Sequence, residues 1–455
     1  MLHLYDSATG DTRELTLREP GKVSMYVCGP TVYAPPHLGH GRMTLTYDIL
    51  RRYLAWTGLD VQFVSNVTDI EDNIINRAEA EGKPWQEIVE RCEKMWWKAM
   101  DALNVARPTH TPHATEYVDE MVDMIGQLMA LDSGYVTPDG IYLSVESVPG
   151  YGLLAHQSLD EMLAGGGDRV VVGADDKRHP SDFVLWKFTK PGEPSWPSPW
   201  GDGRPGWHSE CVVMALQILG EGFDLHTGGQ DLRFPHHENE RAQAVALGRP
   251  FANHWMHNGF VVDTSGEKMS KSLGNVANLL DLVDQYDPRA YRMVLLQTHY
   301  RSPVTVVLDN IESSERSLAR LDALARRAGA SQLPVVSPDA QVLAEFRLYM
   351  DNDLDTPAAT ALMFETVTRA NSMLDERAFA QAAGQVAALH EICTAFGLVL
   401  RDYDVVPADI AAQAAGLDAA RAAKDWATAD AVRAELMTAG WVVENTKDGT
   451  KLHRA

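Results

Sequence analysis

The sequence predicts an α/β fold built on a parallel sheet and followed by a mostly helical C-terminal half. Two short apolar runs, Val23–Val27 and Val61–Val64, end at turn or polar residues, as buried strands do. The apolar stretch Met43–Trp56 between them has helical length, and a strand–helix–strand unit favours a parallel sheet. Ligands of such sheets gather at the carboxyl ends of the strands. The residues expected at this edge are Cys28, His37, His40 and Thr68.

The remaining elements follow in order along the chain. Residues 71–104 have a helical pattern, and 105–205 look inserted, with proline and glycine crowded near their end. Three apolar segments are interpreted as the returning half of the first fold: Val212–Leu219, Phe223–Leu225 and Phe260–Val262. From Leu279 the pattern is mostly helical, with an Ala-, Ser- and Pro-rich link at 328–340 and a bundle at 341–400. Pro407 opens a last small domain, which ends in a short β element around 441–443.

Bulk properties limit the class of protein. At 455 residues the chain is long enough for about three domains. Its N-terminal segment does not have the pattern of a signal peptide, and no apolar run is long enough to span a bilayer. The four cysteines are too few and too scattered for a disulfide framework, so we expect a cytoplasmic protein without a membrane partner. The net charge of −23 disfavours non-specific nucleic-acid binding over the whole surface, but permits a local footprint.

Two segments far apart in the chain together indicate ATP binding. His37-Leu38-Gly39-His40 precedes the first helical stretch, so phosphate can meet a helix N-terminus, two imidazoles and a glycine that allows close approach. Lys268-Met269-Ser270-Lys271-Ser272 offers two mobile cations for the charge that grows on a leaving pyrophosphate. Either segment alone is as well explained by a helix-starting loop or a solvated turn. No Gly-x-x-x-x-Gly-Lys-Ser/Thr segment supports a P-loop.

The ordered pair resembles the two signatures of the class I aminoacyl-tRNA synthetases. The resemblance implies a Rossmann-like catalytic domain in which an amino-acid carboxylate attacks the α-phosphorus of ATP, before the aminoacyl group passes to tRNA. It implies that ATP binds at His37, Gly39, His40, Lys268 and Lys271, with His37, His40, Lys268 and Lys271 also catalytic.

A second group of residues is suited to a metal ion. His236 and Glu240 are four apart after Pro235, so they share one helix face, and Cys28 and Cys211 are thiols far from them in the sequence. Two thiolates, an imidazole and a carboxylate suit Zn²⁺. The spacing alone also fits a buried strand-end thiol and a helix-capping pair.

Four longer segments are very similar to the cysteinyl-tRNA synthetase family. They are Met25–Tyr33, Asn66–Asp69, Gly206–Cys211 and Phe234–Glu240, and the similarity extends over nearly the whole chain. The resemblance implies one Zn²⁺ at Cys28, Cys211, His236 and Glu240. It implies an amino-acid pocket at Gly29, Thr68, Trp207 and Asp231, in which Trp207 forms a wall and Asp231 meets the substrate ammonium. One departure is Thr227, which stands where the family usually has glycine, and it puts the local backbone shape in question.

The family's organisation carried onto this chain predicts six segments. They are the first half of the catalytic domain at 1–104, an inserted connective segment at 105–205, the second half at 206–262, the second signature with stem-contact helices at 263–327, a helical bundle at 341–401, and a small tRNA (anticodon)-binding domain at 407–455. In the last segment we expect phosphate contacts at Arg421, Lys424, Lys447, Lys451 and Arg454.

The predicted function is ATP-dependent activation of L-cysteine and its transfer to tRNA(Cys), with Mg²⁺ accompanying ATP, by a monomer. A substrate-selecting zinc would accept the thiolate of cysteine, whereas serine's hydroxyl stays protonated at neutral pH. One alternative is a ligase of the mycothiol-synthesis type, which joins cysteine to an amino-sugar and has little use for the C-terminal segments. Another is a catalytically idle tRNA-binding paralogue, which the intact His37, His40 and Lys271 disfavour.

Overall fold

The computed structural model describes residues 2–159, 161, 176–263, 278–401, 406–446 and 449–454. The chain divides into two compact units. The first comprises Met1–Arg316, Ala340–Met363 and Glu391–Leu398, and the second comprises Ser317–Asp339, Phe364–His390 and Val399–Ala455. No helix within the described ranges has both the length and the apolar character that a membrane span requires.

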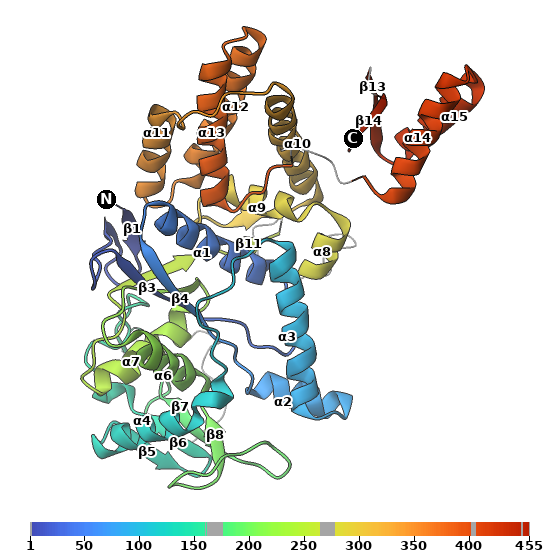
Figure 1. The fold of residues 1–455 in the computed structure, drawn as a ribbon. Coiled ribbons are helices and arrows are strands. Elements are labelled where there is room, and N and C mark those ends of the chain that lie inside the picture. Colours follow the sequence, from blue (N-terminus) through green and yellow to red (C-terminus); the bar gives the residue numbers. More distant parts are fainter. Residues whose placement is uncertain are drawn as a thin grey trace. The chain divides into compact units, whose positions relative to one another are not determined.

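A four-stranded parallel sheet forms the centre of the first unit (Figure 1). Its order is β10-β9-β3-β4, and the strands are β3 (Lys22–Val27), β4 (Asp60–Ser65), β9 (Leu225–Gly229) and β10 (His254–Asn258). The two strands predicted from the sequence are confirmed. β3 is the strand that joins the early and late parts of the chain, because it pairs with β4 on one side and with β9 on the other.

Helix α1 (Leu38–Trp56) connects β3 to β4 and confirms the predicted strand–helix–strand unit. His37 is its N-cap, so the first signature forms the cap and first turn of the helix. Farther along, the buried Asp48 carboxylate accepts from the Arg292 guanidinium at 2.6 Å, and both side chains are about 1% exposed. Arg292 belongs to α9 (Pro288–Leu296), so this ion pair fixes α1 against α9.

The helical stretch after β4 is two helices, α2 (Asp72–Glu81) and α3 (Trp85–Ala102). The sequence pattern of 71–104 did not separate them. Gly82 ends α2 in the left-handed conformation at φ 63°, and Pro84 then stands immediately before α3. Glycine and proline in this order stop one helix and start the next.

The inserted stretch has a sheet and a core of its own. The sheet is antiparallel, in the order β5-β6-β7-β8, with β5 (Gly134–Thr137), β6 (Gly140–Leu143), β7 (Phe183–Phe188) and β8 (Gly203–Pro205). Helices α4 (Val118–Ala130) and α6 (Trp207–Leu219) lie against it (Figure 1). Buried Ile125, Ile141 and Trp186 belong to this core. β8 leads straight into α6, which therefore begins at a fixed position.

Further elements of the first unit lie outside the central sheet. They are the hairpin of β1 (His3–Asp6) and β2 (Asp11–Glu14), helix α7 (Glu238–Ala246), the parallel pair β11 (Val261–Val262) and β12 (Val304–Thr305), and helix α8 (Leu279–Gln285). The apolar segment Val212–Leu219, expected in the returning half, lies within α6, and Phe260–Val262 overlaps β11.

From Leu308 onward, the described residues form helices and then a final hairpin. The helices are α10 (Leu308–Ala330), α11 (Ala340–Asp351), α12 (Thr356–Asp375), α13 (Phe379–Phe396), α14 (Ala408–Ala422) and α15 (Trp426–Thr438), and the strands are β13 (Trp441–Thr446) and β14 (Gly449–Arg454). Pro407 is the N-cap of α14. Leu417, Leu436 and Trp441 form a separate small core, so Trp441 has a packing role.

Candidate active site

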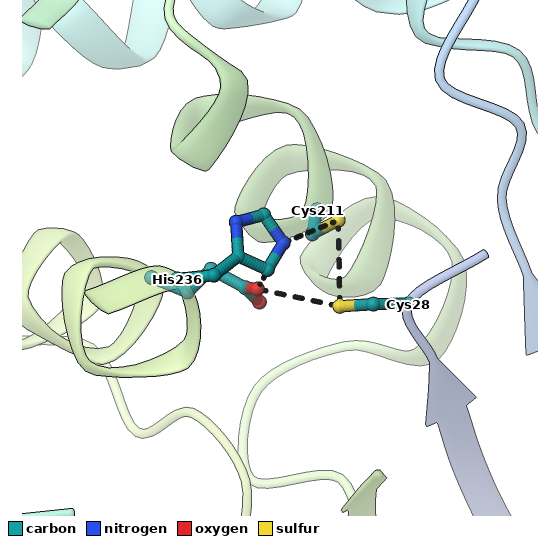
Figure 2. A group of neighbouring side chains, drawn as sticks. Cys28, Cys211 and His236 are labelled. Carbon is teal, nitrogen blue, oxygen red and sulfur yellow. Dashed lines mark hydrogen bonds and ion pairs between the residues drawn. The ribbon is translucent and has the colours of Figure 1, made fainter. Parts of the chain in front are cut away.

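Four potential metal ligands converge at the carboxyl edge of the central sheet. Cys28 directly follows β3, Cys211 lies in α6, and Glu240 lies in α7. His236 lies in a short π-helical turn, Arg233–His237, just before α7. All four side chains are buried. Figure 2 shows the Cys28, Cys211 and His236 side chains pointing toward one another. The fold thus brings together the residues that the resemblance selected.

The separations between these donor atoms are close to those around a tetrahedral zinc ion. The Cys28 Sγ lies 3.6 Å from the Cys211 Sγ and 3.3 Å from the Glu240 Oε1. The His236 Nε2 lies 3.7 Å from the Cys211 Sγ and 2.9 Å from the Glu240 Oε1. Zinc–ligand bonds of about 2.0–2.3 Å place the donors of a tetrahedral site roughly 3.3–3.8 Å apart. Three of the four separations fall in that range, so the donor set fits Zn²⁺.

The ionisable groups of the cluster perturb one another strongly; burial and the neighbouring Cys211 and Glu240, for example, hold the pKa of Cys28 well above its usual range. Burial raises the pKa of a thiol, but the hydrogen bond with Cys28 and the neighbouring His236 outweigh it and lower the pKa of Cys211 to about 6. Burial similarly disfavours an imidazolium, but the Glu240 carboxylate and the Cys211 sulfur raise the pKa of His236 to about 10. A buried group of opposite charges with converging donors is typical of a metal site.

A second set of potential ligands overlaps the first and was not predicted. Cys28, His226, His237 and Glu240 also place their donor atoms within 4.8 Å of one another. The His226 Nε2 lies 2.6 Å from the Glu240 Oε2, and the His237 Nδ1 lies 2.8 Å from the Nε2 of His257. His226 stands next to Thr227 and His237 next to His236, so two imidazoles beside predicted site residues were the signal in the sequence.

The candidate ligand His236 has two further neighbours. Its Nδ1 lies 2.8 Å from the Nδ1 of His208, and its ring stacks on Trp207 with centroids 4.1 Å apart. Trp207 is the first residue of α6, four positions before Cys211, so the helix places it over the cluster. This arrangement is compatible with the expected role of Trp207 as a pocket wall.

The other predicted pocket residues occupy different environments. The Gly29 N–H donates to the Asn66 Oδ1 at 2.8 Å, and a Cβ at position 29 would lie 1.7 Å from the Asn66 carbonyl oxygen, so only glycine fits. The Thr68 hydroxyl donates to the Glu210 Oε2 at 2.7 Å in the interior. Asp231 is exposed and lies two residues after β9.

Glu210 and Thr227 also lie near the cluster. Glu210 was missed by the sequence analysis, although it precedes Cys211 directly; its Oε1 is buried without a hydrogen-bond partner. Burial and the nearby Cys211 sulfur hold the pKa of Glu210 well above its usual range. Thr227, the departure from the family pattern, keeps its place in β9, paired with Val27 and Met256. Its hydroxyl donates to the Tyr26 carbonyl at 3.1 Å, so the side chain is accommodated within the sheet.

The first signature has a reciprocal cap at the start of α1. The His40 N–H donates to the His37 Nδ1, and the His37 N–H donates to the His40 Nδ1, each at 3.2 Å. The rings stack with centroids 3.6 Å apart. A Cβ at Gly39 would lie 2.9 Å from the His37 ring. The cap holds both imidazoles at the positive end of the helix dipole.

The second signature, including Lys268 and Lys271, lies outside the described residues. The chain just after it is held next to the first signature. The Leu279 N–H donates to the Pro36 carbonyl at 2.8 Å, and the Tyr291 hydroxyl donates to the Leu38 carbonyl at 2.6 Å. Two residues that precede or begin α1 are therefore bonded to α8 and α9.

Comparisons with known proteins identify the structural class of this chain. A family model described as "tRNA synthetases class I (C) catalytic domain" matches residues 14–316, and a DALR domain model matches residues 345–401. A solved structure of Mycobacterium tuberculosis methionyl-tRNA synthetase with methionyl-adenylate has a similar fold. Its TM-score is 0.61 at 16% identity, over 82% of this chain and 89% of that one. The fold is thus that of a class I tRNA synthetase.

Curated relatives that match over the full length of the chain identify the family within this class. The chain is 42% identical to the Cysteine–tRNA ligase of Shewanella sediminis over 99% of each sequence. It is 40% identical to that of Caldicellulosiruptor saccharolyticus over the whole of both. The chain belongs to the cysteine–tRNA ligase family of class I aminoacyl-tRNA synthetases.

Proposed function

We propose that this enzyme activates L-cysteine with ATP and transfers it to tRNA(Cys), and that a bound Zn²⁺ selects the substrate thiolate. The observation that carries the proposal is the convergence of Cys28, Cys211, His236 and Glu240 beside Trp207. The membership of the chain in the cysteine–tRNA ligase family supports the overall reaction.

The four converging residues would hold the metal, and zinc bound there would supply a Lewis acid that prefers a thiolate to a hydroxyl. This preference suits cysteine recognition, because an apolar pocket discriminates weakly against an isostere such as serine. Trp207 stacks on the ligand His236 and would limit the pocket to a small side chain. Gly29 and Thr68 would line the pocket, and Asp231 would meet the substrate ammonium.

ATP would bind at the start of α1, with its phosphates near His37, Gly39 and His40 and with Mg²⁺ accompanying it. There the helix dipole and the two capped imidazoles favour negative charge. The cysteine carboxylate attacks the α-phosphorus, the bond to pyrophosphate breaks, and Lys268 and Lys271 neutralise the departing charge. A hydroxyl of the terminal tRNA ribose then attacks the activated carbonyl, and AMP leaves.

The C-terminal half of the chain favours tRNA over an amino-sugar as the acceptor of the cysteinyl group. A cysteine:amino-sugar ligase would share the catalytic core, but the DALR match at 345–401 and the full-length relatives favour tRNA. Residues 407–455 would form the anticodon-binding domain, for which Lys424 and Lys451 are exposed candidate phosphate contacts. The site is proposed to work in a cytoplasmic monomer, where its free buried cysteines stay reduced.

Two assays test the proposal. Purified protein should catalyse ATP–pyrophosphate exchange with cysteine, and exchange with serine should be lower by orders of magnitude. It should then transfer cysteine to tRNA(Cys) and not to an amino-sugar acceptor. Exchange without transfer to tRNA would overturn the acceptor assignment. Equal exchange with serine would overturn selection by a metal, and no exchange at all would favour an idle paralogue.

A further inference from the structure

Arg42 is a buried cation whose hydrogen bonds go to backbone carbonyls. It lies in α1 two residues after His40 and is 2% exposed. Its Nη1 donates to the Phe260 carbonyl at 2.5 Å, and its Nη2 donates to the carbonyls of Tyr300, at 3.0 Å, and Ser302. One side chain of the first signature helix therefore binds two segments that are more than 200 residues away in the sequence.

Comparison with Arg292 shows how unusual this arrangement is. Arg292 is equally buried, but its charge is balanced by the Asp48 carboxylate at 2.6 Å. Among the described residues, no carboxylate lies within ion-pair distance of Arg42. Burial accordingly lowers the pKa of Arg42 to about 10. An unbalanced buried charge disfavours folding, so what Arg42 contributes is the geometry of its three carbonyl contacts.

The three carbonyls belong to the residues that come just before strands β11 and β12. Phe260 immediately precedes β11, and Tyr300 and Ser302 precede β12, its parallel partner. β11 is the last strand before residues 264–277, which contain the second signature. At the other end of that segment, Leu279 donates to the Pro36 carbonyl. The residues on both sides of the second signature are thus hydrogen-bonded to helix α1 or to Pro36, which precedes it.

We infer that Arg42 is a positioning residue for adenylate formation, whose guanidinium fork holds α1 at a set distance from the strand that leads to the second signature. The inference rests on the proposed function, because it assumes that both signatures act on ATP. Lysine cannot replace the fork, since its shorter stem ends in a point charge. If the charge alone were needed, lysine would suffice.

A glycine beside the same carbonyls offers a second, charge-free test. A Cβ at Gly259 would lie 2.5 Å from the Arg301 carbonyl oxygen and 2.8 Å from that of Ser302. Real Cβ atoms do not approach backbone atoms so closely. Gly259→Ala must therefore shift the backbone whose carbonyls accept hydrogen bonds from Arg42. This variant leaves Arg42 and its charge intact.

The experiment measures cysteine-dependent pyrophosphate exchange in Arg42→Lys, Arg42→Met and Gly259→Ala. We expect kcat to fall by about 10- to 100-fold in each, since a misplacement of about 1 Å has effects of this size. The KM for cysteine and the bound zinc should stay at wild-type values. Arg51→Lys is the matched control, because Arg51 also lies on α1 and donates to backbone carbonyls, those of Ala106 and Arg107. It should retain wild-type kcat.

The possible outcomes separate the two proposals. Wild-type kcat in Arg42→Lys would overturn the inference in favour of a charge effect. A parallel loss of bound zinc and of cysteine affinity would overturn it in favour of a general structural role. If Arg42→Met does not fold, Gly259→Ala serves as the test of the inference. Unchanged kcat in Gly259→Ala would then overturn it. Absence of exchange in the wild-type protein would instead overturn the proposed function.

Discussion

Replacement of Cys211 by serine should remove most of the affinity for zinc. The Cys211 Sγ lies 3.6 Å from the Cys28 Sγ and 3.7 Å from the His236 Nε2, so it occupies one corner of the donor cluster. Structural zinc sites bind with about 10–16 kcal/mol, or roughly 2.5–4 kcal/mol for each of four ligands. A serine hydroxyl stays protonated and is a poor ligand. Cys211→Ser should therefore weaken zinc binding by about 100- to 1,000-fold.

The measurement is a zinc dissociation constant, obtained by competition with a chelator of known affinity. Cys92→Ser is the matched control, because Cys92 is also about 1% exposed but packs in a separate apolar cluster with Val32 and Ile88. If Cys211→Ser and Cys92→Ser bind zinc equally tightly, the reasoning is refuted. Loss of zinc only in His237→Ala would place the metal in the second set, which lacks Cys211.

Three further predictions concern catalysis, tRNA binding and pH. Lys271→Ala should slow adenylate formation in single-turnover kinetics by about 100-fold, with little change in ATP affinity, because the lysine acts on charge that develops in the transition state; an unchanged rate would contradict its role. Lys424→Ala combined with Lys451→Ala should raise the KM for tRNA but leave pyrophosphate exchange intact, and salt should weaken tRNA binding to the wild-type protein more than to the variant; equal salt dependence would contradict phosphate contacts. The hydrogen bond with Glu93, at 3.2 Å, raises the pKa of His113, so its stabilisation is complete below the unfolded pKa of about 6.5 and is lost as pH rises through the higher folded value. The melting temperature of His113→Gln should thus fall below that of the wild type at pH 6 and approach it at pH 9, and a constant difference would refute the linkage.

The parts of the fold that could be predicted are those encoded in short segments. Val23–Val27 and Val61–Val64 are apolar over the length of a strand, and the stretch between them has helical length, so local pattern sufficed for β3, α1 and β4. The boundary between α2 and α3 depends on the backbone conformation of one glycine. Gly82 and Pro84 mark this boundary in the sequence, and the prediction of one helical pattern over 71–104 did not use them.

In the candidate site, residues close in sequence could be paired from their spacing, whereas residues distant in sequence could not. His236 and Glu240 share a helical face, so their pairing followed from spacing. Cys28 and Cys211 come from distant elements, and only the resemblance to a family linked them to that pair. His226 and Arg42 were missed as contributors because their partners are far away in sequence. A histidine or an arginine gives no local sign of a carboxylate or a carbonyl that only the folded chain brings near.

The order in which the four candidate ligands are synthesised constrains when a metal could be acquired. Cys28 precedes Glu240 by 212 positions (240 − 28). At about 5–20 residues per second, a ribosome needs roughly 10–40 s to cover that interval. For the first 183 of these positions (211 − 28), the Cys28 thiol has no other member of the cluster to share an ion with, and β3 lacks its neighbour β9 until residue 225 is made. The proposed zinc site is therefore completed late in synthesis, and the pocket around it is the part that a shortage of zinc should leave unfinished.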